Sequence, residues 1–284
     1  LPMTIFDKKP LKGEYAQYVG ELIDYDPLFQ KLPTQLFTFN NAKTPKGEKE
    51  GYLTAILYFA PYKLSGYQMC PFAELAQCFE PCLNTAGRGR FDATQKARIR
   101  KTLMFHQYRP EFMVLLVSEI NRAIRKAKRM GLKLVVRLNG TSDVIWENTP
   151  VVFNKTDPTV PVYSFNIFEL FPQTQFYDYT KYPTRHKLPN NYHLTFSYSG
   201  AASFRPIVDK WVAKRTSQNM AVVFKSKPSI ENSRVILESG YKLLGVIDGD
   251  SNDLRFLDSD NIVVGLTAKG KGKTDDSGFV VRAV

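Results

Sequence analysis

All three cysteines of this chain fall within one short stretch. Cys70, Cys78 and Cys82 are separated by seven and by three residues, in a segment (69–91) that is broken by prolines and closed by glycines. Core cysteines placed by chance would fall on different elements, so this clustering indicates one shared ligand. Three thiolates can hold a zinc ion together with a fourth partner, or three irons of a four-iron cluster with one iron left open.

The choice between these ligands depends on the fourth partner. The histidines His106, His186 and His193 all lie outside the cysteine segment, which favours a four-iron cluster over zinc. Buried thiols without a ligand, and a disulfide with one free thiol, are the weaker alternatives. Residues 1–12 contain no apolar run of the length that a signal peptide needs. We therefore expect an intracellular, reducing compartment, in which a disulfide is disfavoured.

The segments around the cysteines predict an α/β fold. Residues 52–59 are rich in β-formers, so they predict a buried strand whose carboxyl end leads into the cysteine segment. Further strands are predicted at 132–138, 174–179, 193–198, 220–224 and 244–247, and helices from Asp92, from Pro110 to Gly131, and at 164–171, 204–216 and 230–240. This alternation predicts a mainly parallel (βα) barrel or partial TIM-like barrel; a doubly wound open sheet is the competing fold.

The two ends of the chain differ from the barrel domain, which we place at residues 51–260. Residues 1–50 hold several prolines and many charges, and predict an N-terminal arm laid over the core. Residues 261–284 predict a C-terminal β-hairpin with strands at 262–266 and 278–282. The loop between them contains three lysines that could bind a phosphate backbone: Lys269, Lys271 and Lys273. The alternative is that this loop is simply a mobile, solvated hairpin tip.

The chain is strongly basic. It has 39 Lys and Arg residues against 27 Asp and Glu, a net charge of +12, which favours a nucleotide or nucleic acid as partner. The exposed face of the predicted helix that ends at Gly131 is also basic, and such a face is more often simply solvated. No apolar run approaches the roughly 18 residues of a membrane-spanning helix, so we expect a soluble, cytoplasmic protein without a membrane partner.

Parallel α/β folds collect their working residues at the carboxyl ends of the strands. After the second predicted strand comes a polar turn that could bind a cofactor or merely cap a helix: Asn139, Gly140, Thr141, Ser142 and Asp143. Asp178 and Lys181 follow the third strand, as a catalytic acid and amine or as an ion pair. Asp248 and Asp250 follow the last strand, where they could act as a base or bind a hydroxylated group such as ribose. A calcium loop is disfavoured because Asn261 stands at its twelfth position.

A cysteine triplet after the first strand of a βα repeat, with a glycine-containing polar turn after the second, resembles the radical SAM superfamily. The resemblance implies that Cys70, Cys78 and Cys82 hold a four-iron cluster, that S-adenosylmethionine chelates the open iron, and that an electron donor is needed. The turn 139–143 would bind the methionine amine. The cysteine spacing is wider than the superfamily's usual three and two, and no Gly-Gly-Glu is present. CPFAELAQCFEPCLNTAGR, VRLNGTSD, QFYDYTK and DGDSNDLRFLD also resemble motifs of uncharacterised bacteriophage-encoded proteins, over most of residues 40–282.

These observations give one leading hypothesis and two alternatives. The leading hypothesis is a phage-encoded, radical-SAM-like iron–sulfur enzyme that modifies a nucleotide or nucleic acid. The first alternative is a nucleic-acid-binding viral or plasmid protein with a structural metal. The second is a zinc-containing DNA base-exchange enzyme with Asp248 or Asp250 as nucleophile. A Ser-His-Asp hydrolase motif and a Gly-x-Gly-x-x-Gly turn after the first strand are both missing from the sequence, which counts against hydrolase and dinucleotide-binding functions.

Overall fold

The computed structural model describes residues 33, 35–39, 44–153, 163–185, 187–214, 218–226, 234–236 and 242–282. Most of the predicted N-terminal arm lies outside these residues. From that arm the structure describes strand β1 (Phe37–Thr38) and helix α3 (Thr44–Lys49). β1 pairs antiparallel with the first long strand, so this part of the arm extends the sheet.

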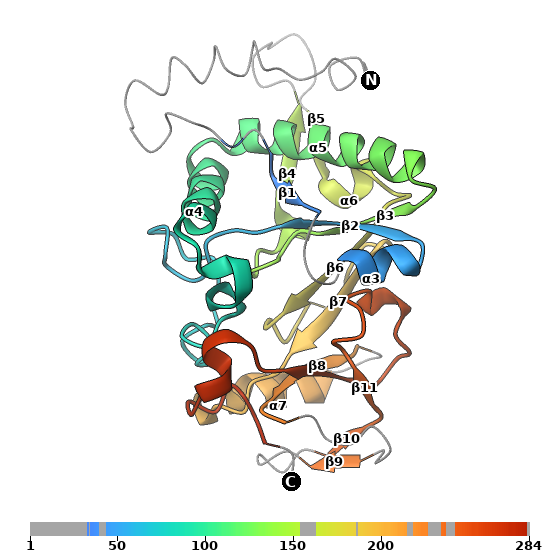
Figure 1. Cartoon of the computed structure of the whole chain (residues 1–284). Coiled ribbons are helices and arrows are strands. Elements are labelled where there is room, and N and C mark those ends of the chain that lie inside the picture. The colour runs from blue at the N-terminus through green and yellow to red at the C-terminus, as the bar shows by residue number, and fades with distance from the viewer. Residues whose placement is uncertain are drawn as a thin grey trace.

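Helices and strands alternate along the rest of the chain (Figure 1). The strands are β2 (Tyr52–Leu57), β3 (Lys133–Arg137), β4 (Pro150–Phe153), β5 (Tyr163–Asn166), β6 (Gln175–Thr180), β7 (Tyr192–Ser197), β8 (Met220–Phe224), β9 (Arg234–Ile236), β10 (Lys242–Leu244), β11 (Val246–Asp248) and β12 (Val263–Thr267). The α-helices are α4 (Asp92–Gln107), α5 (Arg109–Arg129), α6 (Ile167–Leu170) and α7 (Arg205–Lys214). Short 3₁₀ helices are η2 (Leu83–Thr85), η3 (Gly87–Arg90), η4 (Trp146–Asn148), η5 (Ala202–Phe204), η6 (Arg255–Leu257) and η7 (Gly270–Thr274).

The main sheet has eight strands in the order β1-β2-β3-β6-β7-β8-β12-β11. Every pair from β2 to β11 is parallel. From β2 to β8 each parallel strand lies beside the preceding one in the chain, an order that right-handed crossovers build by winding in one direction. The predicted mainly parallel α/β fold is therefore confirmed. The predicted barrel is not, because the sheet formed by the described residues is open, with β1 at one edge and β11 at the other.

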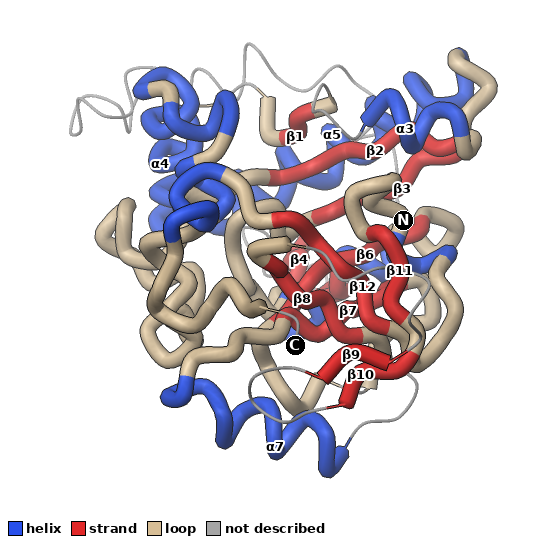
Figure 2. The backbone as a smooth tube through the Cα atoms, turned by 60° about the horizontal axis from the view of Figure 1, so that its bottom comes forward, coloured by secondary structure: helices blue, strands red, loops and turns tan. Residues whose placement is uncertain are grey.

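Two apolar layers on one face of the sheet hold the helices in place. The apolar stripe of α5, with Phe112, Leu116 and Ile120, packs with Leu53 and Leu57 of β2 in the larger layer. α7 contributes to a second layer together with residues of β7 and β8. Figure 2 shows α4 and α7 at opposite ends of the sheet. As predicted, α5 ends at a glycine, Gly131, whose positive φ of 68° suits the residue after a helix.

The segment after β11 covers the other face of the sheet. Its Leu254 is buried with Val135 of β3 and Tyr177 of β6. Asp253 pairs with Arg137 at 2.9 Å and accepts a hydrogen bond from the Tyr177 hydroxyl at 3.2 Å. This segment therefore reaches back from the β11 edge to the strands near the other edge, which ties the two halves of the open sheet together.

Three local predictions are corrected by the structure. The C-terminal hairpin is wrong: β12 lies between β8 and β11 and is parallel to both, and Val281 makes a parallel bridge to Phe224. Residues 234–236 of the predicted helix 230–240 form strand β9, and its other residues lie outside the described part. The predicted helix 164–171 begins as strand β5 and becomes helical only in α6, after the capping box of Asn166 and Glu169.

None of the helices in the described part of the chain is long and apolar enough to cross a membrane.

Candidate functional site

The candidate site lies along the edge where the parallel strands end. The cysteine segment follows β2, the polar turn 139–143 follows β3, and Lys181 follows β6. Two hydrogen bonds join the cysteine segment to the segments after β3 and β7: Asp143 N to Met69 O at 2.9 Å and Ser199 Oγ to Ala76 O at 2.7 Å. A third, from Thr141 Oγ1 to Phe59 O at 2.6 Å, joins the polar turn to the residues directly after β2. The predicted gathering of polar segments at this edge is therefore present for these strands.

All three cysteines are free thiols, so the structure contains no disulfide between them. The Cys70 thiol accepts the Tyr62 N–H at 3.4 Å and donates to Thr141 O at 3.6 Å, which places it against the polar turn. Cys82 precedes η2, where its sulfur accepts the N–H of Asn84 at 3.4 Å and caps the helix. Cys78 packs against the apolar layer of β7 and β8.

The three thiols lie within electrostatic reach of one another and of the Lys181 ammonium. Burial raises the pKa of Cys70 and of Cys78, and it raises the pKa of Cys82 to about 11. Lys181 lowers the pKa of Cys78 and Cys82 in return. Burial lowers the pKa of Lys181, and the three thiols and Asp143 oppose that shift. We call Cys70, Cys78, Cys82 and Lys181 the thiol site.

Lys181 is held among neutral partners. Its ammonium donates to the carbonyl and hydroxyl oxygens of Ser197, at 3.0 and 3.1 Å, and lies 5.1 Å from the ring centres of Phe204 and Phe279. These contacts fix the side chain at the carboxyl end of β7. The nearby thiols and Asp143 are the groups that could supply negative charge to it.

The histidines considered as a fourth ligand are spread over the chain. The His106 ring stacks on Tyr67 at 4.1 Å, and its Nε2 lies 3.1 Å from the sulfur of Met69, the neighbour of Cys70 in the chain. His193 lies on β7, where burial lowers its pKa. His186 falls outside the described residues. Within the described part, no three His, Cys, Asp or Glu side chains are placed so that they could hold one metal ion.

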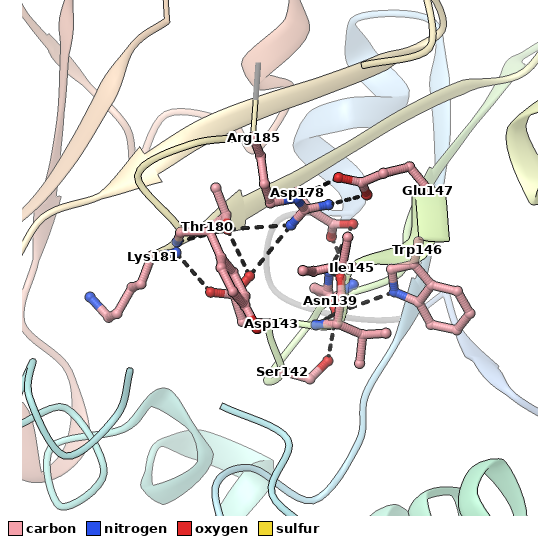
Figure 3. Close-up of polar contacts among 12 residues, drawn as sticks. Asn139, Ser142, Asp143, Ile145, Trp146, Glu147, Asp178, Thr180, Lys181 and Arg185 are labelled. Atoms are coloured by element: carbon pink, nitrogen blue, oxygen red, sulfur yellow. Dashed lines mark hydrogen bonds and ion pairs between the residues drawn. The ribbon is translucent and has the colours of Figure 1, made fainter. Parts of the chain in front are cut away.

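The polar turn is organised by Asn139 and Asp178 (Figure 3). The Asp178 carboxylate is fully buried and accepts the Asn139 N–H at 2.7 Å. The Asn139 side-chain oxygen in turn accepts hydrogen bonds from Ser142 Oγ, Val144 N and Trp146 Nε1, at 2.8, 3.0 and 3.2 Å. These two residues therefore fix the shape of the turn, and the catalytic role predicted for Asp178 stays a prediction.

Asp143 anchors the end of β6 to the turn. Its carboxylate accepts Thr180 Oγ1 at 2.8 Å and the Lys181 N–H at 2.7 Å, and it lies 3.5 Å from the Arg185 guanidinium. Arg185 also pairs with Glu147 at 2.5 Å. Figure 3 shows the Lys181 side chain extending away from this network. The backbone N–H of Lys181 therefore binds Asp143, while its charged side chain lies near the three thiols.

Asp248 and Asp250 lie at the end of the edge strand β11. Asp250 accepts the Thr267 N–H at 2.9 Å and pairs with Lys269 at 3.0 Å, and its carbonyl accepts Lys46 Nζ at 2.7 Å. The Asp248 side chain accepts the Asp250 N–H at 2.8 Å, as in an Asx turn. These contacts connect the pair to β12 and α3, and the roles predicted for both residues stay predictions.

The three lysines proposed to grip phosphate lie in and beside η7, which packs on η2 of the cysteine segment. Lys271 N–H donates to Thr85 Oγ1 at 3.4 Å, and its ammonium pairs with Glu80 at 3.3 Å. Lys269 pairs with Asp250, as described above, and Lys273 is exposed. The structure thus brings these lysines to the cysteine segment, which the hairpin prediction did not foresee.

A protein-family model, Gene product 88, matches residues 35–283. The chain belongs to the Gene product 88 family. That description is consistent with the predicted phage origin. Comparisons with curated proteins and with solved structures give no match. The matched region includes the whole described site of this family member, from the cysteine segment to η7.

Several residues of the site in this Gene product 88 family member were missed by the sequence reasoning. Arg185, Glu147 and Tyr192 form the buried network behind Asp143 and Asp178. Arg98 of α4 donates to the Asn84 side chain beside Cys82 and lies over the Tyr58 ring at 4.7 Å. Arg and Glu are surface residues in most sequences, so their types and spacing gave no sign of burial.

Replacing Gly140 by Ala is expected to destabilise the protein by about 1–3 kcal/mol. A Cβ at this position would lie 2.5 Å from Cδ1 of Tyr58 and 2.7 Å from the carbonyl oxygen of Leu57, so β2 and the turn would have to separate. Chemical denaturation measures the effect. Gly272→Ala is the control, because its Cβ would meet nothing closer than 3.6 Å and should change stability by about 0.5 kcal/mol or less. Equal effects of the two variants would contradict the close approach of turn and strand.

Proposed function

We propose that this chain is a radical-SAM-type iron–sulfur enzyme in which Cys70, Cys78 and Cys82 hold a four-iron cluster. The observation that carries the proposal is the position of the thiol site. Three partly buried thiols in the segment after the first parallel strand and the partly buried Lys181 ammonium after β6 gather at the carboxyl edge of a parallel sheet. That edge is where enzymes with parallel sheets keep their reacting groups.

The chemistry of the donor set fits an iron–sulfur cluster. A thiol that binds iron loses its proton, and the three resulting thiolates carry negative charge. Without a metal, burial keeps these thiols neutral, so Asp143 is the carboxylate that offsets the Lys181 ammonium while burial still lowers the pKa of Lys181. Thiolates bound to iron would add negative charge beside Lys181 to that of Asp143. The three cysteines of a four-iron cluster each bind a different iron, so they need not converge on one point as ligands of a single ion must.

The turn 139–143 is the proposed contact for S-adenosylmethionine. It touches the cysteine segment directly, through Cys70 Sγ to Thr141 O and through Asp143 N to Met69 O. When bound, the cluster and S-adenosylmethionine would supply a carbon radical that removes a hydrogen atom from the substrate. The side chains of Asn139, Ser142 and Asp143 are used within the protein, so these residues would orient the turn. A separate electron-donor protein would be the partner.

The metal content of anaerobically purified protein tests the proposal. We expect brown protein with about four irons and four sulfides per chain. Cys78→Ala should lose the colour and most of the iron. Leu83→Ala changes an exposed residue of the same segment and should retain both. Stoichiometric zinc in a colourless protein would contradict the proposal and favour a structural or base-exchange zinc site. Protein without metal, even after reconstitution with iron and sulfide, would also contradict it.

A further inference from the structure

Two segments that are far apart in the sequence place cations beside the thiol site. Arg88 and Arg90 lie in η3, a few residues after Cys82, and Lys271 and Lys273 lie in η7. η7 packs on η2, the helix that Cys82 caps, and Figure 1 shows the red η7 next to the teal segment that contains η2 and η3. A Cβ on Gly270 would lie 3.0 Å from the Ala86 side chain, so the segments touch closely. We call the four residues the cationic border.

The cationic border presents four cations at the surface, with the exposed acids Asp92 and Asp276 close to them in the chain. All four side chains are exposed. Glu80 pairs with Lys271, but both side chains are about two-thirds exposed, so water and a phosphate can readily replace that ion pair. The nearby Asp275 carboxylate is hydrogen-bonded within its own segment, where it accepts the backbone N–H of Val280 at 2.9 Å. The border can therefore offer guanidinium and ammonium groups to an anion.

The same surface also carries exposed apolar side chains. Phe91, directly after η3, is 53% exposed, and Leu83 of η2 is 49% exposed. The Arg90 guanidinium lies 5.8 Å from the ring centre of Phe91. An exposed aromatic ring beside arginines suits a nucleic acid base that stacks on the ring while its phosphates meet the cations.

We infer that the cationic border and Phe91 bind single-stranded nucleic acid next to the thiol site. A single strand fits better than a duplex, because paired bases are not free to stack on a side chain. A reacting base must also leave a duplex before it can reach partly buried groups such as the three thiols. Binding itself does not require a metal; the further step, that the bound strand is the substrate, rests on the proposed function.

Fluorescence anisotropy with a labelled oligothymidylate of about 20 nucleotides, and with a duplex of the same length, tests the inference. Arg88→Ala/Arg90→Ala/Lys273→Ala should weaken binding of the single strand at least tenfold. It should also reduce the slope of log affinity against log salt by about 2, the effect of losing three phosphate contacts. Phe91→Ala should weaken binding several-fold and leave the slope unchanged, because stacking releases few counterions.

The matched control removes the same charge from another surface. Arg125, Lys128 and Arg129 are exposed on α5, which Figure 1 places at the top of the molecule, away from η7. Arg125→Ala/Lys128→Ala/Arg129→Ala should change affinity less than twofold. Equal losses in the two triple variants would overturn the inference. So would duplex binding as tight as single-strand binding, equally effective competition by polyglutamate, or no binding at all.

The assay also separates this inference from the proposed function. It is run on iron-reconstituted protein and on metal-free protein of the same preparation. Single-strand binding by protein that takes up no iron would support the inference while the proposed function fails. An iron–sulfur protein that shows no preference for the single strand would retain the proposed function and overturn the inference.

Discussion

Arg185→Met is expected to destabilise the protein by about 3–5 kcal/mol, the usual cost of breaking a buried ion pair by removing one partner. The Arg185 side chain is 5% exposed and lies between two carboxylates, Glu147 at 2.5 Å and Asp143 at 3.5 Å. It also donates to the Tyr192 hydroxyl at 3.2 Å. Methionine would fill the space without donors and would leave both acids buried and unpaired. Chemical denaturation at neutral pH measures the loss.

The control for this prediction is an arginine of an exposed ion pair. Arg205 pairs with Asp209 one turn further along α7, and both side chains are about half exposed. Arg205→Met should therefore change the free energy of unfolding by about 0.5 kcal/mol or less. Similar losses in the two variants would show that the buried network contributes no more than a surface pair. In that case the turn 139–143 would need another explanation for its fixed shape.

The long strands and helices were predictable because their signals are local. Runs of β-branched and aromatic residues gave β2, β3, β6, β7 and β8 to within a few residues. Helical spacing of apolar residues, with Pro110 at its start and Gly131 at its end, gave α5. Each of these signals is complete within one segment, so no knowledge of the rest of the fold was needed.

Pairing between distant segments was not predictable in the same way. The predicted strand at 262–266 is confirmed as β12. The next segment with strand-forming residues, 278–282, suggested a hairpin partner for it. In the structure β12 is inserted between β8 and β11. The residues of a strand do not predict which strands will pair with it, because parallel neighbours come from separate parts of the chain. Closure of the sheet is also a question of edge pairing, and the edges here are β1 and β11.

The candidate site was predictable as far as its residue types are rare or clustered. Three cysteines in 13 positions, 70–82, indicated a shared environment, and the structure places the three thiols within electrostatic reach. Lys181 was found from its position after a strand. Arg98, Glu147 and Arg185 were missed, because only the folded chain reveals that these common charged residues are buried or nearly buried.

The site combines two parts with different tasks. The first part is a network of hydrogen bonds and ion pairs that fixes the turn against Met69 and Cys70, and it consists of Asn139, Asp143, Asp178 and Arg185. The thiol site lies at the ends of β6 and β7 and contains the Lys181 ammonium, which the Asp143 carboxylate partly offsets. A change in the first part should therefore alter stability, and a change in the second should alter metal binding.

Asp178→Asn is expected to become more stable relative to the unchanged protein as the pH rises from 4 to 8. Burial raises the pKa of Asp178 from 3.8 to about 7, so the folded protein holds this proton more tightly than the unfolded chain does. The resulting stability is present in full below about pH 4 and is lost as the pH rises through 7. A shift of about three units corresponds to about 4 kcal/mol. Asparagine carries no ionisable proton and can still accept the Asn139 N–H, so it avoids that loss.

Urea denaturation of the Asp178→Asn variant and of the unchanged protein, at several pH values between 4 and 8, measures the difference between their free energies of unfolding. The control is Asp209→Asn on the exposed side of α7, for which this difference should not change with pH. A flat difference for Asp178→Asn would mean that the Arg137 and Arg185 charges, which oppose the effect of burial, keep Asp178 ionised throughout. A rising difference would mean that Asp178 exchanges a proton near neutral pH, as a general acid or base requires. Because the side chain is fully buried, any such proton must pass between the groups that pack around it, which include the Asn139 N–H and the Tyr192 hydroxyl that donate to its carboxylate.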